Sequence, residues 1–130
     1  MSFERFEKML KECEEKGDSK GRAAILFEMA KMKISEGGQE EALLLLMEAF
    51  SRFKDQEDLS GVCFTGELLG QLLFVSGSRD DGLRMIRESL AGFNKMGFSV
   101  EVERTEELLA AMEAHAAENP LQNDNGQAEA

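Results

Sequence analysis

The chain has 130 residues, 42% of them hydrophobic, which is enough for one domain with a continuous core. Fifteen Lys and Arg residues against 26 Asp and Glu residues give a formal net charge of −11, which opposes binding to nucleic acid or to an anionic membrane surface. The apolar run at residues 42–47 is far shorter than the roughly 18 to 20 residues that cross a bilayer, so we expect neither a nucleic-acid nor a membrane partner.

Apolar residues recur three and four positions apart between clusters of Gly, Asp and Ser, which is the period of a helix. This pattern predicts an all-α chain with six helices, at residues 2–16, 20–35, 39–55, 59–75, 79–96 and 99–118. Ser2, Ser78 and Ser99 are expected to cap the starts of three helices, and Pro120 to follow the end of the last. The helical domain is therefore predicted to span 1–118, and the polar residues 119–130 to form a disordered tail.

Shifting the sequence against itself by 40 residues superimposes similar residues. The matched pairs include Gly37 with Gly77, Leu43 with Leu83, Glu48 with Glu88, and Phe53 with Phe93. The shift continues at both ends, so the chain reads as a half-repeat, two whole repeats and another half-repeat. A two-helix period of this size predicts a solenoid, in which stacked helix pairs bury a continuous core.

Within each repeat, large and small residues follow a fixed spacing. The positions are Met29, Ala30, Ala42, Leu46 and Ala49 in the first repeat, and Leu69, Gly70, Gly82, Ile86 and Ser89 in the second. This spacing resembles the motif of the tetratricopeptide repeat family, although the period is 40 residues, where that family commonly has roughly 34. The resemblance implies a right-handed solenoid of antiparallel helix pairs that acts in protein–protein interaction.

The resemblance also implies a concave groove, lined by the first helix of each pair, that holds a peptide. The corresponding positions are Phe27, Lys31, Ile34, Phe64, Glu67, Gln71, Phe74, Arg104, Glu107 and Ala111. Basic or amide residues would be needed at Phe27 and Glu67 to hold an acidic peptide end, so a segment with apolar anchors and basic flanks suits the groove better. Alternatively, Phe27, Phe64 and Phe74 fill the core between stacked helices.

Two residues of the apolar run at 42–47 do not follow the repeat. Leu44 and Met47 are apolar where the sister helices carry charged residues, and they share one helix face because they are three residues apart. Either a neighbouring element covers this face, or it is an exposed patch for self-association or for a partner. The exposure of the two side chains distinguishes these interpretations.

No pattern in the chain indicates catalysis or a cofactor. His115 is the only histidine, and no nucleophile-elbow, metalloprotease or phosphate-loop motif is present. Cys13 and Cys63 are not in a CxxC pair, so neither a zinc site nor a disulfide framework is indicated. The amino-terminal residues lack the features of a secretory signal, so we expect a cytoplasmic protein.

Two classes of function follow from the sequence. The first is a non-enzymatic adaptor or chaperone-like scaffold that binds a peptide or partner protein in its groove. The second is a structural repeat protein that associates with itself, as a homodimer or within a larger assembly.

Overall fold

The structure is a computed structural model that describes residues 2–121, and within them it contains six α-helices. These are α1 (Phe3–Lys16), α2 (Ser19–Ser35), α3 (Gln39–Asp55), α4 (Leu59–Val75), α5 (Arg79–Met96) and α6 (Ser99–Glu118). The all-α prediction is confirmed, and each helix begins and ends within one residue of its predicted position. Of the predicted tail, residues 122–130 lie outside the described residues.

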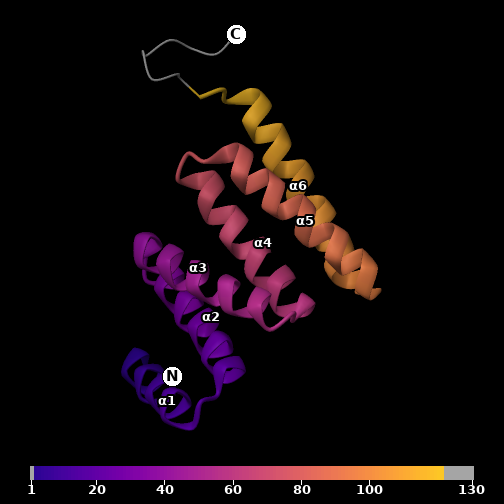
Figure 1. Cartoon of the computed structure of the whole chain (residues 1–130). Coiled ribbons are helices and arrows are strands. Elements are labelled where there is room, and N and C mark those ends of the chain that lie inside the picture. Colours follow the sequence, from indigo (N-terminus) through magenta and orange to yellow (C-terminus); the bar gives the residue numbers. More distant parts are fainter. Residues whose placement is uncertain (1, 122–130) are drawn as a thin grey trace.

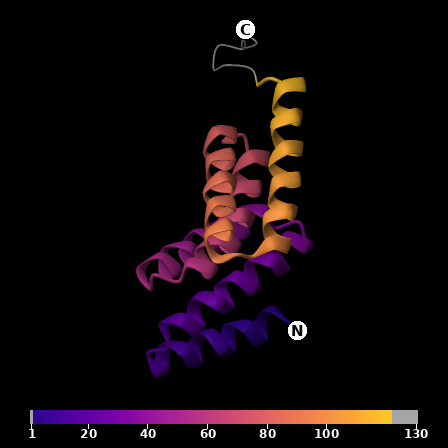
Figure 2. The ribbon, with the colours of Figure 1, turned by 90° about the vertical axis from the view of Figure 1, so that its right-hand side faces the viewer.

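Consecutive helices run in opposite directions, and each packs mainly against its neighbours in the chain (Figure 1). The first and last helices therefore lie at opposite ends of a stack. The helix axes also change direction along this stack, so that α1 and α2 are strongly tilted against α5 and α6 (Figure 2). None of the helices in the described part of the chain is long and apolar enough to cross a bilayer.

Small residues allow α4 and α5 to approach each other closely. A Cβ atom added to Gly70 would lie 2.9 Å from the carbonyl oxygen of Gly82 and 3.0 Å from Cδ1 of Ile86. A Cβ atom added to Gly82 would in turn lie 2.6 Å from the carbonyl oxygen of Gly70. The two backbones are thus in direct contact, with no room for a side chain between them.

The same positions are buried in the other repeat. Ala30 on α2 and Ala42 on α3 are fully buried in one cluster with Leu46. All ten residues of the large-and-small pattern are buried in the structure. Positions forty residues apart therefore have equivalent burial, as the repeat predicts.

The end helices close the core at both ends of the stack. On α1, Phe6 packs in a cluster with Ile25 and Met29 of α2. On α6, Met112 packs with Phe74 and Ile86. The terminal helices α1 and α6 therefore cover the two ends of the core.

The five turns between helices share one backbone geometry that recurs every 20 residues. Residues 17, 37, 57, 77 and 97 all have a positive φ, and the next residue in each turn donates its N–H to a carbonyl five residues earlier at 2.8 to 3.0 Å. This is the left-handed helix end that favours glycine. Four of the five positions are glycine, with φ between +67° and +105°, whereas the third is Glu57, with φ +55°.

The predicted helix caps are only partly correct. The Ser2 hydroxyl accepts a hydrogen bond from a backbone N–H of α1 at 3.2 Å, as expected. Ser78 makes no such bond, and the Ser99 prediction is wrong because this residue is already the first residue of α6. Instead, Asp18 and Asp58 accept hydrogen bonds from backbone N–H groups at the starts of α2 and α4, at 2.9 and 3.1 Å. The first helix of each whole repeat, α2 or α4, thus begins with an aspartate cap.

We predict that Glu57→Gly raises the free energy of unfolding by about 1 kcal/mol, because glycine adopts a positive φ without a steric penalty. Urea denaturation of the two proteins measures the change. Glu57→Ala is the control, since it removes the carboxylate and keeps the strained backbone. Equal stability of the Gly and Ala variants would contradict the prediction.

We predict that Gly70→Ala lowers the free energy of unfolding by about 1 to 3 kcal/mol, because the added methyl group would meet the Gly82 carbonyl oxygen. Helix propensity alone would give the opposite sign, a gain of about 1 kcal/mol. Thermal and urea denaturation decide between the two signs. Ser51→Ala on the exposed face of α3 is the control and should be neutral or slightly stabilising. A more stable Gly70→Ala variant would show that the helices do not touch at this point.

Candidate protein-interaction surfaces

The groove positions of the first repeat lie mainly against the core. Phe27 and Ile34 are half-buried and pack against the cluster that contains Leu69 and Leu72. Lys31 is exposed, pairs with Glu28 at 3.0 Å, and places its ammonium group 5.1 Å from the ring centre of Phe27. Phe27 and Ile34 therefore serve chiefly to join α2 to the helices that follow.

Glu67 takes part in contacts that join α4 to α6. It is only 9% exposed, and its carboxylate accepts a hydrogen bond from Arg104 at 2.8 Å and one from the Thr105 hydroxyl at 2.5 Å. Two predicted groove residues, Glu67 and Arg104, are thus brought together as an ion pair. A carboxylate with both oxygens engaged in this way holds the helices together and is not free to bind a peptide.

Phe64 also belongs to the junction between α4, α5 and α6. Its ring packs edge-on against Phe93 with ring centres 5.0 Å apart, and the Arg104 guanidinium lies 5.9 Å from its centre. Phe64 is half-buried, whereas Phe74 is buried, and the ring centre of Phe74 lies 6.0 Å from that of the exposed His115. The alternative interpretation of these phenylalanines, as core residues, therefore describes Phe64 and Phe74 well.

An apolar cleft lies between α4 and α6, on the side where groove residues were predicted. Its volume is about 310 Å³, and it is lined by Gln71, Phe74, Val75, Leu108, Ala111, Met112 and His115. Three of these, Gln71, Phe74 and Ala111, are positions that the sequence assigned to the groove. Val75 was not singled out from the sequence, yet it is 65% exposed at the edge of the cleft. Glu107 is exposed on α6, one turn before Ala111.

Leu44 and Met47 are exposed in the structure. Leu44 is 68% and Met47 is 53% accessible to solvent, so no element within residues 2–121 covers this face of α3. The interpretation that a neighbouring element buries them is wrong for the described chain. The two side chains form an apolar patch on a helix whose other exposed residues are polar or charged.

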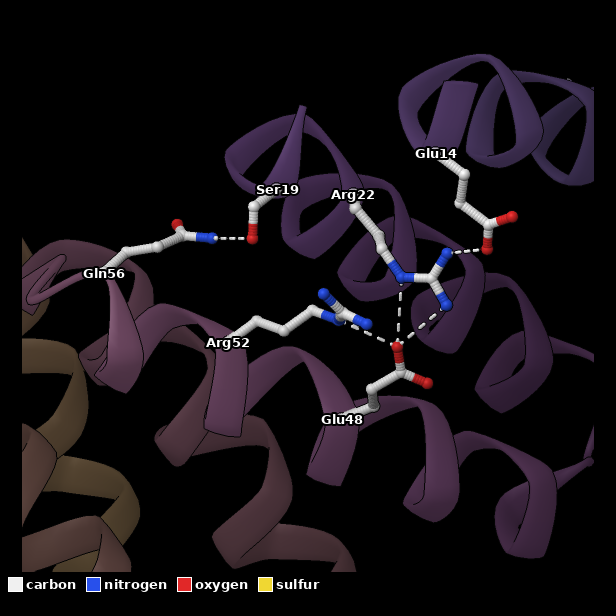
Figure 3. A network of polar contacts seen from close by, with 6 residues as sticks. All are labelled: Glu14, Ser19, Arg22, Glu48, Arg52 and Gln56. Carbon is white, nitrogen blue, oxygen red and sulfur yellow. Dashed lines mark hydrogen bonds and ion pairs between the residues drawn. The ribbon is translucent and has the colours of Figure 1, made fainter. Parts of the chain in front are cut away.

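A polar network that the sequence analysis missed joins α1, α2 and α3 (Figure 3). The guanidinium of Arg22 on α2 is hydrogen-bonded to Glu14 on α1 and to Glu48 on α3, the latter at 3.1 and 3.2 Å. Arg52 donates to the same Glu48 oxygen at 2.9 Å. The Glu48–Arg52 pair has helical i,i+4 spacing and was visible in the sequence, whereas the Arg22 contacts depend on how three helices pack.

The network shifts the pKa values of Glu48 and Arg22. Partial burial by itself would raise the pKa of Glu48, but hydrogen bonds from Arg52 and Arg22, together with their positive charges, lower it overall. For Arg22, burial acts to lower the pKa, and the hydrogen bonds and negative charges of Glu14 and Glu48 outweigh this and raise it. Both shifts favour the charged forms, so the network is an ion pair at neutral pH.

Comparison of the chain with protein-family models, curated proteins and solved structures gives no match.

We predict that Glu48→Gln lowers the free energy of unfolding at pH 7 and has a smaller effect at pH 3. Because the folded-state pKa of Glu48 is lowered, its stabilising contribution is present above the ordinary value of 4.5 and is lost as the pH falls through the lowered value. The effect should be small and should weaken with salt, since the carboxylate is partly exposed. Urea denaturation at both pH values measures it.

Glu88→Gln is the matched control, because Glu88 occupies the sister position forty residues on and, within residues 2–121, forms no ion pair. An equal loss of stability for the two variants at pH 7 would contradict a specific role for Glu48.

Proposed function

We propose that the chain is a tetratricopeptide-like repeat protein that binds a partner protein or peptide and catalyses no reaction. The proposed architecture is a right-handed stack of antiparallel helix pairs. Its support is the burial of both sets of small residues, with Ala30 fully buried and Gly70, forty residues on, at a close helix contact. A fold of this kind is an architectural frame, so the proposed function must come from its exposed surfaces.

The observation that carries the binding proposal is the apolar cleft between α4 and α6. A volume of about 310 Å³ is at the lower end of ligand sites and suits one or two apolar side chains of a larger partner. The exposed Val75 extends this apolar surface beyond the cleft. The groove is shorter than the ten predicted positions suggest, because Phe64, Glu67 and Arg104 are occupied by contacts within the chain.

The proposed partner is a segment with apolar anchors and basic flanks. Exposed Glu107 lies one turn from Ala111, and the chain carries a net charge of −11. Basic residues beside the anchors would therefore speed association and favour correct partners. An acidic segment would be repelled.

Self-association is the second candidate. The exposure of Leu44 and Met47 favours it, and this patch lies on α3, apart from the residues that line the cleft.

We predict that Ala111→Glu weakens binding of selected peptides at least about tenfold, because the new carboxylate would enter an apolar cleft. The peptides come from selection of a displayed random library against the wild-type protein, and fluorescence titration gives their affinities. Enriched sequences should contain apolar residues at helical or alternating spacing with Lys or Arg beside them.

Ala110→Glu is the matched control, because Ala110 is exposed on the same helix and is not among the residues that line the cleft. It should leave the affinity unchanged. Failure to enrich any peptide, or equal binding by the two variants, would rule out the cleft as the binding site.

A further inference from the structure

A line of exposed residues runs along the outer face of α3 from one end of the helix to the other. From the start of the helix to its end, it consists of Glu40, Leu44, Met47, Ser51 and Lys54. Successive members are three or four residues apart, so they lie on one face. We call this set the α3 line. Its centre is apolar, and its two ends carry opposite charges.

The apolar centre is specific to α3. On α5, the residues forty positions after Leu44 and Met47 are Arg84 and Arg87. Arg84 pairs with Asp81 at 2.8 Å, and Arg87 pairs with Glu113 on α6 at 2.9 Å. The corresponding face of α5 is therefore charged and paired within the chain, whereas the face of α3 at Leu44 and Met47 is apolar and exposed.

The charged ends of the α3 line have no ion-pair partner within residues 2–121. Glu40 and Lys54 are both exposed, and neither forms a salt bridge with a described residue, although Lys54 lies 5.4 Å from the ring centre of Phe50. Glu40 is seven residues before Met47, and Lys54 is seven residues after it. At about 1.5 Å per residue, both charges lie about 10 Å from Met47 along the helix axis, in opposite directions.

We propose that α3 packs against α3 of a second copy of this chain, antiparallel, around a two-fold axis beside Met47. In this arrangement the residue seven before the axis on one copy faces the residue seven after it on the other. Glu40 therefore pairs with Lys54 of the second copy, twice in the dimer, and Leu44 and Met47 of both copies are buried between the charge pairs. A parallel arrangement would instead bring Glu40 near Glu40 and Lys54 near Lys54.

This charge pattern points to a second copy as the occupant, because the α3 line carries both the acidic residue and the basic residue that pair across the two-fold axis. The inference specifies the self-association candidate and does not depend on peptide binding at the cleft, which is formed by other helices. A 17-residue helix offers a contact about 25 Å long, which is small for a tight dimer. We therefore expect a dissociation constant on the order of micromolar to tens of micromolar.

The test uses Glu40→Lys and Lys54→Glu, measured separately and mixed. Alone, each variant places like charges at both ends of its homodimer, so its dissociation constant should rise about tenfold. In a mixture, every Lys faces a Glu in the heterodimer, and affinity should return to near the wild-type value. Combining both substitutions in one chain should restore it as well. Sedimentation velocity over about 1 to 500 µM measures each case.

Loss of folding cannot produce this result, because mixing two proteins does not repair the stability of either. A second pair of variants tests the apolar centre. Leu44→Ser with Met47→Ser should raise the dissociation constant at least about tenfold, whereas Val100→Ser, which removes an equally exposed apolar residue from α6, should not change it. A monomeric wild type across this range would overturn the proposal. A mixture of the two charge variants that dimerises no better than either alone would overturn it too.

Discussion

The fold depends on direct backbone contact between paired helices. At the crossing of α4 and α5, Gly70 and Gly82 leave no space for a side chain, and Ile86 fills the groove beside them. In the other repeat, the sister residues Ala30 of α2 and Ala42 of α3 are fully buried in one cluster. Each helix uses one face for the contact within its pair. The apolar residues on its other faces are buried only when neighbouring pairs stack. The terminal helices α1 and α6 then cover the two ends of the core.

Most of this architecture was predictable from the sequence, for identifiable reasons. Helical period and turn residues gave the helix bounds to within one residue, and the shift of 40 residues indicated which positions would be buried. The shorter, 20-residue recurrence of the turn was missed because Glu57 replaces glycine at the middle position. A glycine in the sequence indicates a turn position with positive φ, as at four of the five turns. Glu57 adopts a positive φ without being glycine, so its sequence gives no such sign.

The interaction surfaces were harder to predict, because they depend on which side chains the neighbouring helices leave uncovered. Glu67 and Phe64 had the right positions for a groove, but α6 supplies Arg104 and Thr105 to one of them, and α5 supplies Phe93 to the other. Leu44 and Met47, in contrast, are left uncovered by the neighbouring helices, and the sequence alone did not decide whether they would be buried or exposed. Contacts such as Arg22 with Glu48 connect residues at no fixed spacing, so a single sequence gives little sign of them.

The central claim is that residues forty positions apart occupy equivalent places at close contacts between helices. Nuclear Overhauser effects in a labelled sample of the full chain measure this most directly. We predict a cross-peak between the α-protons of Gly70 and Gly82, whose backbones are in contact, and one between the methyl groups of Ala30 and Ala42, which are buried in one cluster. Absence of both cross-peaks in a folded, fully assigned protein would contradict the account.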